Sequence, residues 1–154
     1  MKTFFYILCF SIFLSCNTDN SKQASSSQNT HSEKDEMLNS VKGENGKYIV
    51  DHVTAEYLHR LENTVTNFKL IAKKRKPAVD IYNEFSEILK RELGYLSANT
   101  NITGEGNDHL KIIVEKITAQ NIAIAGNDLE QAKTAFQQVC NLTDGINSEF
   151  DYNN

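Results

Sequence analysis

The sequence has no tryptophan, a single proline and no excess of positive charge. Its 154 residues include 16 basic and 20 acidic side chains, and the net charge at neutral pH is −4. Proteins that hold nucleic acid by its phosphates carry an excess of Lys and Arg. We therefore expect no nucleic acid among the partners of this chain.

A long apolar run is missing as well. The apolar segment 4–14, which follows Lys2, is much shorter than the ~20 residues that cross a bilayer as a helix. It ends in Phe13-Leu14-Ser15-Cys16, and the chain is polar from there on. This tetrapeptide resembles the lipobox of bacterial lipoprotein signals, although that family favours Leu at the position of Phe13.

The resemblance implies that residues 1–15 are a signal peptide and that Cys16 is diacylated and becomes the N-terminus of an exported protein. Acylated Cys16 would hold this protein on a lipid bilayer of the bacterial cell envelope, because two or three acyl chains make attachment effectively permanent. The alternative is that Cys16 only ends the apolar segment. After processing, Cys140 would be the one free thiol, which excludes an intramolecular disulfide.

The next stretch is too polar to fold alone. Residues 17–30 contain no large apolar side chain and cannot bury enough surface to offset the entropy lost on ordering. We expect residues 16–34 to be a lipidated, flexible tether with a reach of about 25 Å. Residues 35–150 are expected to form one helical domain.

The start of this domain predicts a short, optional helix. Ser32 and Asp35 have the spacing of a capping box, and Met37, Leu38 and Val41 could form a short apolar strip after them. A glycine-rich turn follows and would end this helix.

Two long amphipathic helices are expected on either side of Pro77, because proline cannot continue a helix but can begin one. The first spans residues 48–75 and the second begins at Pro77. A single helix kinked at Pro77 is the alternative. Apolar residues recur every three or four positions in both helices, as on the buried face of an amphipathic helix. In the first helix the predicted buried positions are Val50, Val53, Tyr57, Leu61, Val65, Phe68 and Ala72. In the second they are Ile81, Tyr82, Phe85, Ile88, Leu89 and Leu96.

Two further helices are expected after a loop at residues 97–106. Each follows the letters Gly-Asn-Asp, at 106–108 and at 126–128, and Asn and Asp are good N-caps. Residues 144–145 are expected to end the last helix, and residues 151–154 to fray. The predicted fold class is all-α, an antiparallel up-down four-helix bundle without strands, or three long helices with a Pro77 kink. The buried positions predicted for the two helices after the loop are Leu110, Ile113, Val114, Ile117, Ile124, Leu129, Ala132, Phe136, Val139, Thr143 and Ile146.

One stripe of the first long helix carries candidate metal ligands. His52, Glu56 and His59 lie at i, i+4 and i+7 and share this stripe, which His109 could approach from the third helix. Di-iron bundles need two Glu-x-x-His motifs and two further glutamates, whereas this stripe supplies one motif. We expect a solvated stripe and no cofactor, with metal binding as the alternative.

The densest charge in the sequence is Lys73, Lys74, Arg75 and Lys76. At the end of a helix these cations would complement the negative end of the helix dipole. The functional alternative is contact with anionic lipid headgroups or with an acidic partner.

No pattern of catalytic residues is present. Cys140 falls on the predicted buried side of the last helix, where a free cysteine acts as a small apolar residue. The glutamates at 84, 87, 92 and 115 are expected on helix exteriors, with no pair placed for acid–base catalysis. We expect no enzyme activity.

Residues 117–146 contain Asn121-Ile122-Ala123-Ile124-Ala125-Gly126-Asn127-Asp128 and resemble the last two helices of bacterial periplasmic helical bundles. Some of those proteins accompany copper-efflux proteins and some carry covalent haem. This chain has no Cys-x-x-Cys-His motif and no Cys-Pro-Met-containing tail. The resemblance therefore implies a bundle more than it implies metal handling.

Together these patterns predict a lipid-anchored envelope protein whose helical domain binds another envelope protein. The contact would use an exposed helix face or the loop at residues 97–106. The alternatives are a carrier of a metal or a small ligand, and an inhibitor or immunity lipoprotein, which the acidic net charge permits.

Overall fold

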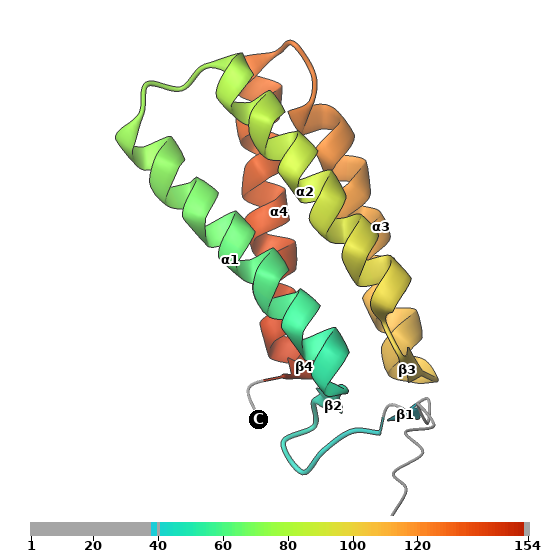
Figure 1. The fold of residues 1–154 in the computed structure, drawn as a ribbon. Helices are drawn as coiled ribbons and strands as arrows, with labels where there is room; N and C mark the ends of the chain where they lie inside the picture. Colours follow the sequence, from blue (N-terminus) through green and yellow to red (C-terminus); the bar gives the residue numbers. More distant parts are fainter. Residues whose placement is uncertain (1–37, 40, 153–154) are drawn as a thin grey trace, which may run out of the picture. The chain divides into compact units, whose positions relative to one another are not determined.

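A computed structural model describes residues 38–39 and 41–152 of the chain (Figure 1). All of them belong to one compact unit, Lys34–Asn154. The predicted signal peptide 1–15, the tether 16–34 with Cys16, and the start of the predicted short helix at 32–37 lie outside the described residues. None of the helices in the described ranges combines the length and the apolar character needed to cross a membrane.

Four long helices make up most of the described domain, which confirms the all-α prediction. They are α1 (His52–Lys74), α2 (Val79–Asn99), α3 (Glu105–Ile124) and α4 (Leu129–Glu149). Helices α1 and α3 each pack against both α2 and α4. Because the helical backbone is interrupted around Pro77, the chain forms four helices and not three with a kink.

Two pairs of very short parallel strands were not expected from the sequence. Strand β1 (Leu38–Asn39) pairs with β3 (Ile102–Thr103), and β2 (Tyr48–Ile49) pairs with β4 (Phe150–Asp151). Strand β2 leads into α1 and β4 follows α4, so this pair joins the beginning and the end of the helical domain (Figure 1).

The short helix predicted around Leu38 and Val41 is wrong. Leu38 lies in β1, and Val41, which was expected on a buried face, is 64% exposed. Lys42 forms an antiparallel bridge with Tyr48 instead. The turn between them contains Gly46 with φ 76°, a conformation that glycine adopts without strain.

Helix α1 begins at His52, later than the predicted residue 48, because Asp51 is its N-cap. The Asp51 Oδ1 atom accepts hydrogen bonds from the backbone N–H groups of Val53 and Thr54, at 3.0 Å each. These bonds satisfy N–H groups that have no partner inside the helix. The residues before the cap are therefore free to form β2.

The repeated Gly-Asn-Asp letters act as a cap in only one of their two places. Asp128 caps α4 and accepts from the N–H groups of Glu130 and Gln131 at 2.9 and 3.0 Å. Asp108 already lies inside α3, whose N-cap is Gly104 with φ 75°. The predicted loop at 97–106 is correspondingly shorter, since it begins after Asn99 and contains β3.

The described residues after position 143 continue the fold further than the sequence predicted. Helix α4 continues through residues 144–145 to Glu149, and Ile146 is 2% exposed. Asp151 lies in β4, and Phe150 and Tyr152 are buried, so the predicted fraying is wrong for residues 151–152, whereas residues 153–154 lie outside the described residues. The Phe150 ring lies 5.6 Å from that of Tyr48, so side-chain packing as well as strand pairing holds this end.

All four helices contribute to the hydrophobic core. Phe68, Tyr82, Phe85 and Phe136 meet where α1, α2 and α4 come together, and the rings of Phe68 and Phe85 stack at 4.1 Å. The side chains with the least exposure are Phe150, Leu58, Leu61, Leu89, Leu96, Ile117, Ile124, Ile146, Val139 and Thr54.

Most of the core positions predicted for the four long helices are buried, but two of them are wrong. Val53 and Ile88 are 39% and 40% exposed. In α1, Thr54 and Leu58 occupy the core side instead. Val50, which the prediction used to set the phase of this helix, lies before its N-cap and therefore does not share its periodicity.

Candidate functional site

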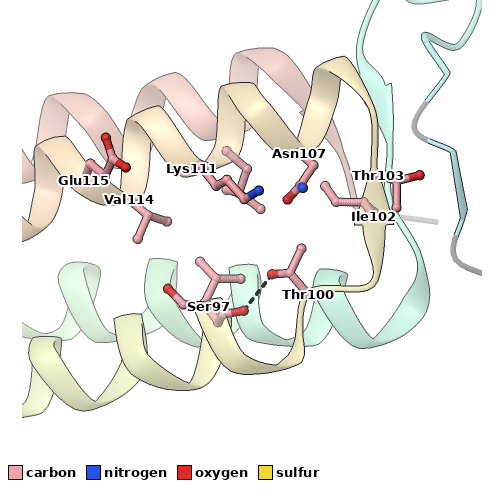
Figure 2. Close-up of a pocket in the computed structure, with 10 residues that line it drawn as sticks. Ser97, Thr100, Ile102, Thr103, Asn107, Lys111, Val114 and Glu115 are labelled. Carbon is pink, nitrogen blue, oxygen red and sulfur yellow. Dashed lines mark hydrogen bonds between the residues drawn. The ribbon is translucent and has the colours of Figure 1, made fainter.

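A pocket of about 370 Å³ lies between α2 and α3, next to β3 (Figure 2). This volume falls in the range of about 300–1,000 Å³ that is usual for small-molecule sites. Part of the loop that the sequence predicted at 97–106 forms its wall. The pocket is lined by Leu96, Ser97, Thr100, Ile102, Thr103, Asn107, Leu110, Lys111, Val114 and Glu115.

The inner wall of this pocket is apolar and rigidly held. Leu96, Ile102 and Leu110 are at most 2% exposed and belong to the hydrophobic core. The pocket therefore borders the core directly, and the apolar lining residue that keeps accessible surface is the half-buried Val114.

The outer part of the pocket is polar. Ser97, Asn107 and Lys111 have no hydrogen-bond or ion-pair partner among the described residues for their side chains. The Thr100 hydroxyl donates to the carbonyl oxygen of Leu96 at 2.6 Å, which leaves its own oxygen able to accept. In Figure 2, Asn107 and Lys111 lie side by side on the α3 wall, and the carboxylate of Glu115 is turned away from α2.

The cationic segment, residues 73–76, is at the end of α1. All four side chains, Lys73, Lys74, Arg75 and Lys76, are exposed. Within the described ranges none of them forms an ion pair or a side-chain hydrogen bond, and the C-cap contact is the backbone N–H of Arg75 on the Ile71 carbonyl at 3.0 Å. Their charges are therefore open to solvent or to a partner.

Exposed apolar side chains lie close to the cationic segment. Leu70 is 49% exposed, and Ile71 and Ile88 are 40% exposed. Ile71 and Ile88 line a shallow groove of about 200 Å³ between α1 and α2. Positive charge and apolar surface thus occur together at this end of the domain.

The candidate metal ligands do not converge. His52 and Glu56 are exposed, whereas the His59 Nε2 atom lies 3.0 Å from the carbonyl oxygen of Tyr152 and its ring meets that of Tyr152 edge-on at 4.8 Å. Within the described ranges, no group of three or more His, Cys, Asp or Glu side chains could hold a metal ion. The role of His59 seen here is to fix the end of the chain on α1.

His109 contacts the end of the helical domain rather than this stripe. Its Nδ1 atom lies 3.2 Å from a carboxylate oxygen of Glu149, and Glu105 lies 3.8 Å from its Nε2 atom. Its ring is 5.3 Å from that of Tyr48. His59 and His109 therefore approach the ends of the same strand pair, β2 and β4, from two different helices.

Glu92 and Cys140 are both buried. Glu92, predicted on a helix exterior, is 8% exposed and forms an ion pair of 2.9 Å with Arg60 of α1. Cys140 is buried as predicted, and burial raises the pKa of its thiol. A thiol held neutral in this way is a poor nucleophile.

No family model, no curated protein and no solved structure matches the chain.

Proposed function

We propose that this chain is an exported envelope lipoprotein, held on a membrane by acylated Cys16, and that its helical domain is a non-enzymatic interaction module. The observation that carries the proposal is the place of the cationic segment. It spans the end of α1, whereas the chain enters the domain through β1 and β2, before α1 begins. At ~1.5 Å per residue, α1 separates these two ends by roughly 35 Å.

We infer that the four helices are arranged as an antiparallel up-down bundle. The connections 75–78, 100–104 and 125–128 are short, and short connections favour antiparallel neighbours. Each helix also packs against its neighbours in the chain. Such a bundle would display the turn that holds the cationic segment away from the end to which the tether is joined.

The proposed partner is an acidic surface of another envelope protein. Four unpaired cations in sequence provide charge, and Leu70 and Ile71 beside them provide apolar contact area. Partners recognised in this way associate faster at low salt, because exposed charges are screened over about 8–10 Å at physiological ionic strength.

The anchor is tested by Cys16→Ser in cells. Loss of the protein from the membrane fraction is expected, because the acyl chains would be absent. Unchanged membrane retention would contradict the lipoprotein assignment.

The interaction module is tested by in-cell crosslinking of the full chain, with Lys73, Lys74, Arg75 and Lys76 all changed to Gln. A crosslinked partner should be lost, while membrane attachment and thermal stability stay the same. Lys90→Gln together with Lys116→Gln is the control for a variant in which only Lys73 and Lys74 are changed to Gln, because it removes the same number of exposed cations outside the cationic segment. Equal loss in both variants would show that total charge matters and not this segment.

A small-ligand carrier is the second candidate, and one observation favours it. The pocket between α2 and α3 has the size of a ligand site and contains side chains without partners. If the carried ligand were a metal ion, the side chains of His52, Glu56 and His59 would have to move together to bind it.

A further inference from the structure

We propose that the pocket between α2 and α3 binds a small amphipathic carboxylate, with its anionic group beside Lys111 and Asn107 and its apolar part against the core. The proposal depends neither on the lipid anchor nor on the cationic segment. It rests on three features of the pocket: an unpaired cation, a rigid apolar wall and a carboxylate that faces elsewhere.

The unpaired cation is Lys111. Glu115 lies one turn further along α3, at the usual spacing for a helical ion pair, yet no ion pair joins the two side chains. Lys111 is exposed, and its ammonium group is therefore available at the pocket to donate a charge-assisted hydrogen bond.

Neighbouring polar groups suit a carboxylate. The Asn107 amide can donate to one oxygen while Lys111 donates to the other, and both side chains lie on the same wall (Figure 2). On the facing helix, the Ser97 hydroxyl is a further donor, and no side chain or backbone group in the described part of the chain bonds to it. A planar group with two acceptor oxygens would use donors from both sides of the pocket.

The apolar wall specifies the rest of the ligand. Val114 lines the pocket and is half-buried, so it offers hydrocarbon surface that a simple inorganic anion would leave in contact with water. A second hollow of about 230 Å³ lies between α2 and α3, shares Ser97 with the first, and is bordered by Gly94, which has nothing within 4 Å of where a Cβ would be. A hydrocarbon chain of moderate length therefore has room.

A zwitterionic ligand such as a free amino acid fits less well. Its ammonium group would need an anionic partner in the pocket. Glu115 is the only carboxylate among the residues that line this pocket, and Figure 2 shows it turned away from α2. We therefore assign the site to a monoanion.

The test is a titration of the full chain, held in a neutral detergent, with hexanoate. The readout is the NMR shift of methyl groups on Ile102, Leu110 and Val114, which report occupancy directly. Saturable shifts are expected for hexanoate, and much weaker ones for hexan-1-ol, which has the same hydrocarbon chain without the charge.

Lys111→Ala should weaken hexanoate binding about tenfold, the usual loss for a hydrogen bond to a charged group. Lys116→Ala is the matched control: it removes the same charge from the same helix at an exposed position that does not line the pocket. Ser97→Phe, which fills the pocket from an exposed position, should abolish the shifts. Glu115→Gln should leave binding unchanged or tighter.

Four results would overturn the proposal. One is the absence of saturable shifts with hexanoate, and another is an equal response to hexanoate and hexan-1-ol. The third is an equal effect of the Lys111 and Lys116 substitutions. The fourth is weaker hexanoate binding in Glu115→Gln, which would mean that the carboxylate of Glu115 supports the site and does not merely face away from it.

Discussion

Arg60 and Glu92 join α1 to α2 through an ion pair of 2.9 Å in which the Glu92 side chain is 9% exposed. The Arg60 guanidinium also lies 5.3 Å from the ring of Tyr57 and 5.2 Å from that of Tyr95. A carboxylate this deeply buried is tolerated because a cation compensates it. Arg60 in turn is held in place by the two flanking rings.

Removal of the Arg60 charge should destabilise the domain. In Arg60→Met, Glu92 keeps its burial and loses its partner, and we expect the free energy of unfolding to fall by about 1–3 kcal/mol, less than for a fully buried pair because Arg60 itself is 41% exposed. Urea denaturation followed by circular dichroism measures this change.

Arg91→Met is the matched control for this pair. Arg91 lies 3.9 Å from the same carboxylate, but its side chain is 58% exposed. An exposed pair of this kind contributes about 0–1 kcal/mol. If both substitutions cost the same, the interpretation of Arg60–Glu92 as a buried pair would be wrong.

The end of the chain is expected to carry much of the stability. Phe150 is 0% exposed and follows the last helix, so Phe150→Ala should lower the free energy of unfolding by about 3–5 kcal/mol. Ile122→Ala is the control, because Ile122 is 74% exposed and should cost less than about 0.5 kcal/mol. A small effect at Phe150 would mean that this side chain is not held in the core in solution, and that fraying reaches one residue before the predicted range 151–154.

The helices were readable from the sequence because each buries one continuous face. Leu61, Val65 and Phe68 follow the helical period without interruption, and their burial agrees with the prediction. The error at Val53 arose where the chain leaves a strand, because a residue outside the helix was counted in its periodicity. Element type was therefore predictable, whereas the helix start depended on the cap at Asp51.

The strands and the pocket could not be predicted from the sequence. Each strand has two residues, too few for an alternating pattern, although Phe150-Asp151-Tyr152 does alternate apolar and polar side chains. The pocket brings Ser97 of α2 and Lys111 of α3 together across a turn. The sequence around Lys111 contains no motif that marks a binding residue. Only the structure shows that its ammonium group forms no ion pair or hydrogen bond with the described residues.

The two copies of Gly-Asn-Asp provide a direct test of cap chemistry. Asp128→Ala should cost about 0.5–2 kcal/mol, because it removes two hydrogen bonds to the first turn of α4. Asp108→Ala should cost less, because Asp108 lies inside α3 and only complements its dipole. Thermal or urea unfolding of the two variants measures the difference, and equal costs would show that Asp108 also acts as a cap.

Tyr152 should make stability depend on alkaline pH. Burial, followed by the nearby Glu62 carboxylate, raises the pKa of its phenol above the usual value of 10.0. The folded state keeps the proton while the unfolded chain releases it near pH 10, so this stabilisation is complete below about pH 10 and is lost as the pH rises from there through the folded pKa. The slope can reach about 1.4 kcal/mol for each pH unit.

Tyr152→Phe should flatten part of this decline, because phenylalanine has no proton to lose. It should also lower stability near neutral pH, since the Tyr152 hydroxyl bonds to Asn147 and lies 3.4 Å from Glu62. Tyr48 and Tyr82, whose pKa values burial also raises, leave a residual slope in the variant. Urea unfolding between pH 8 and 11, buffered at constant ionic strength, measures both effects. Equal slopes in the two proteins would mean that Tyr152 is solvated in the folded state and that the end of the chain is not packed on α1.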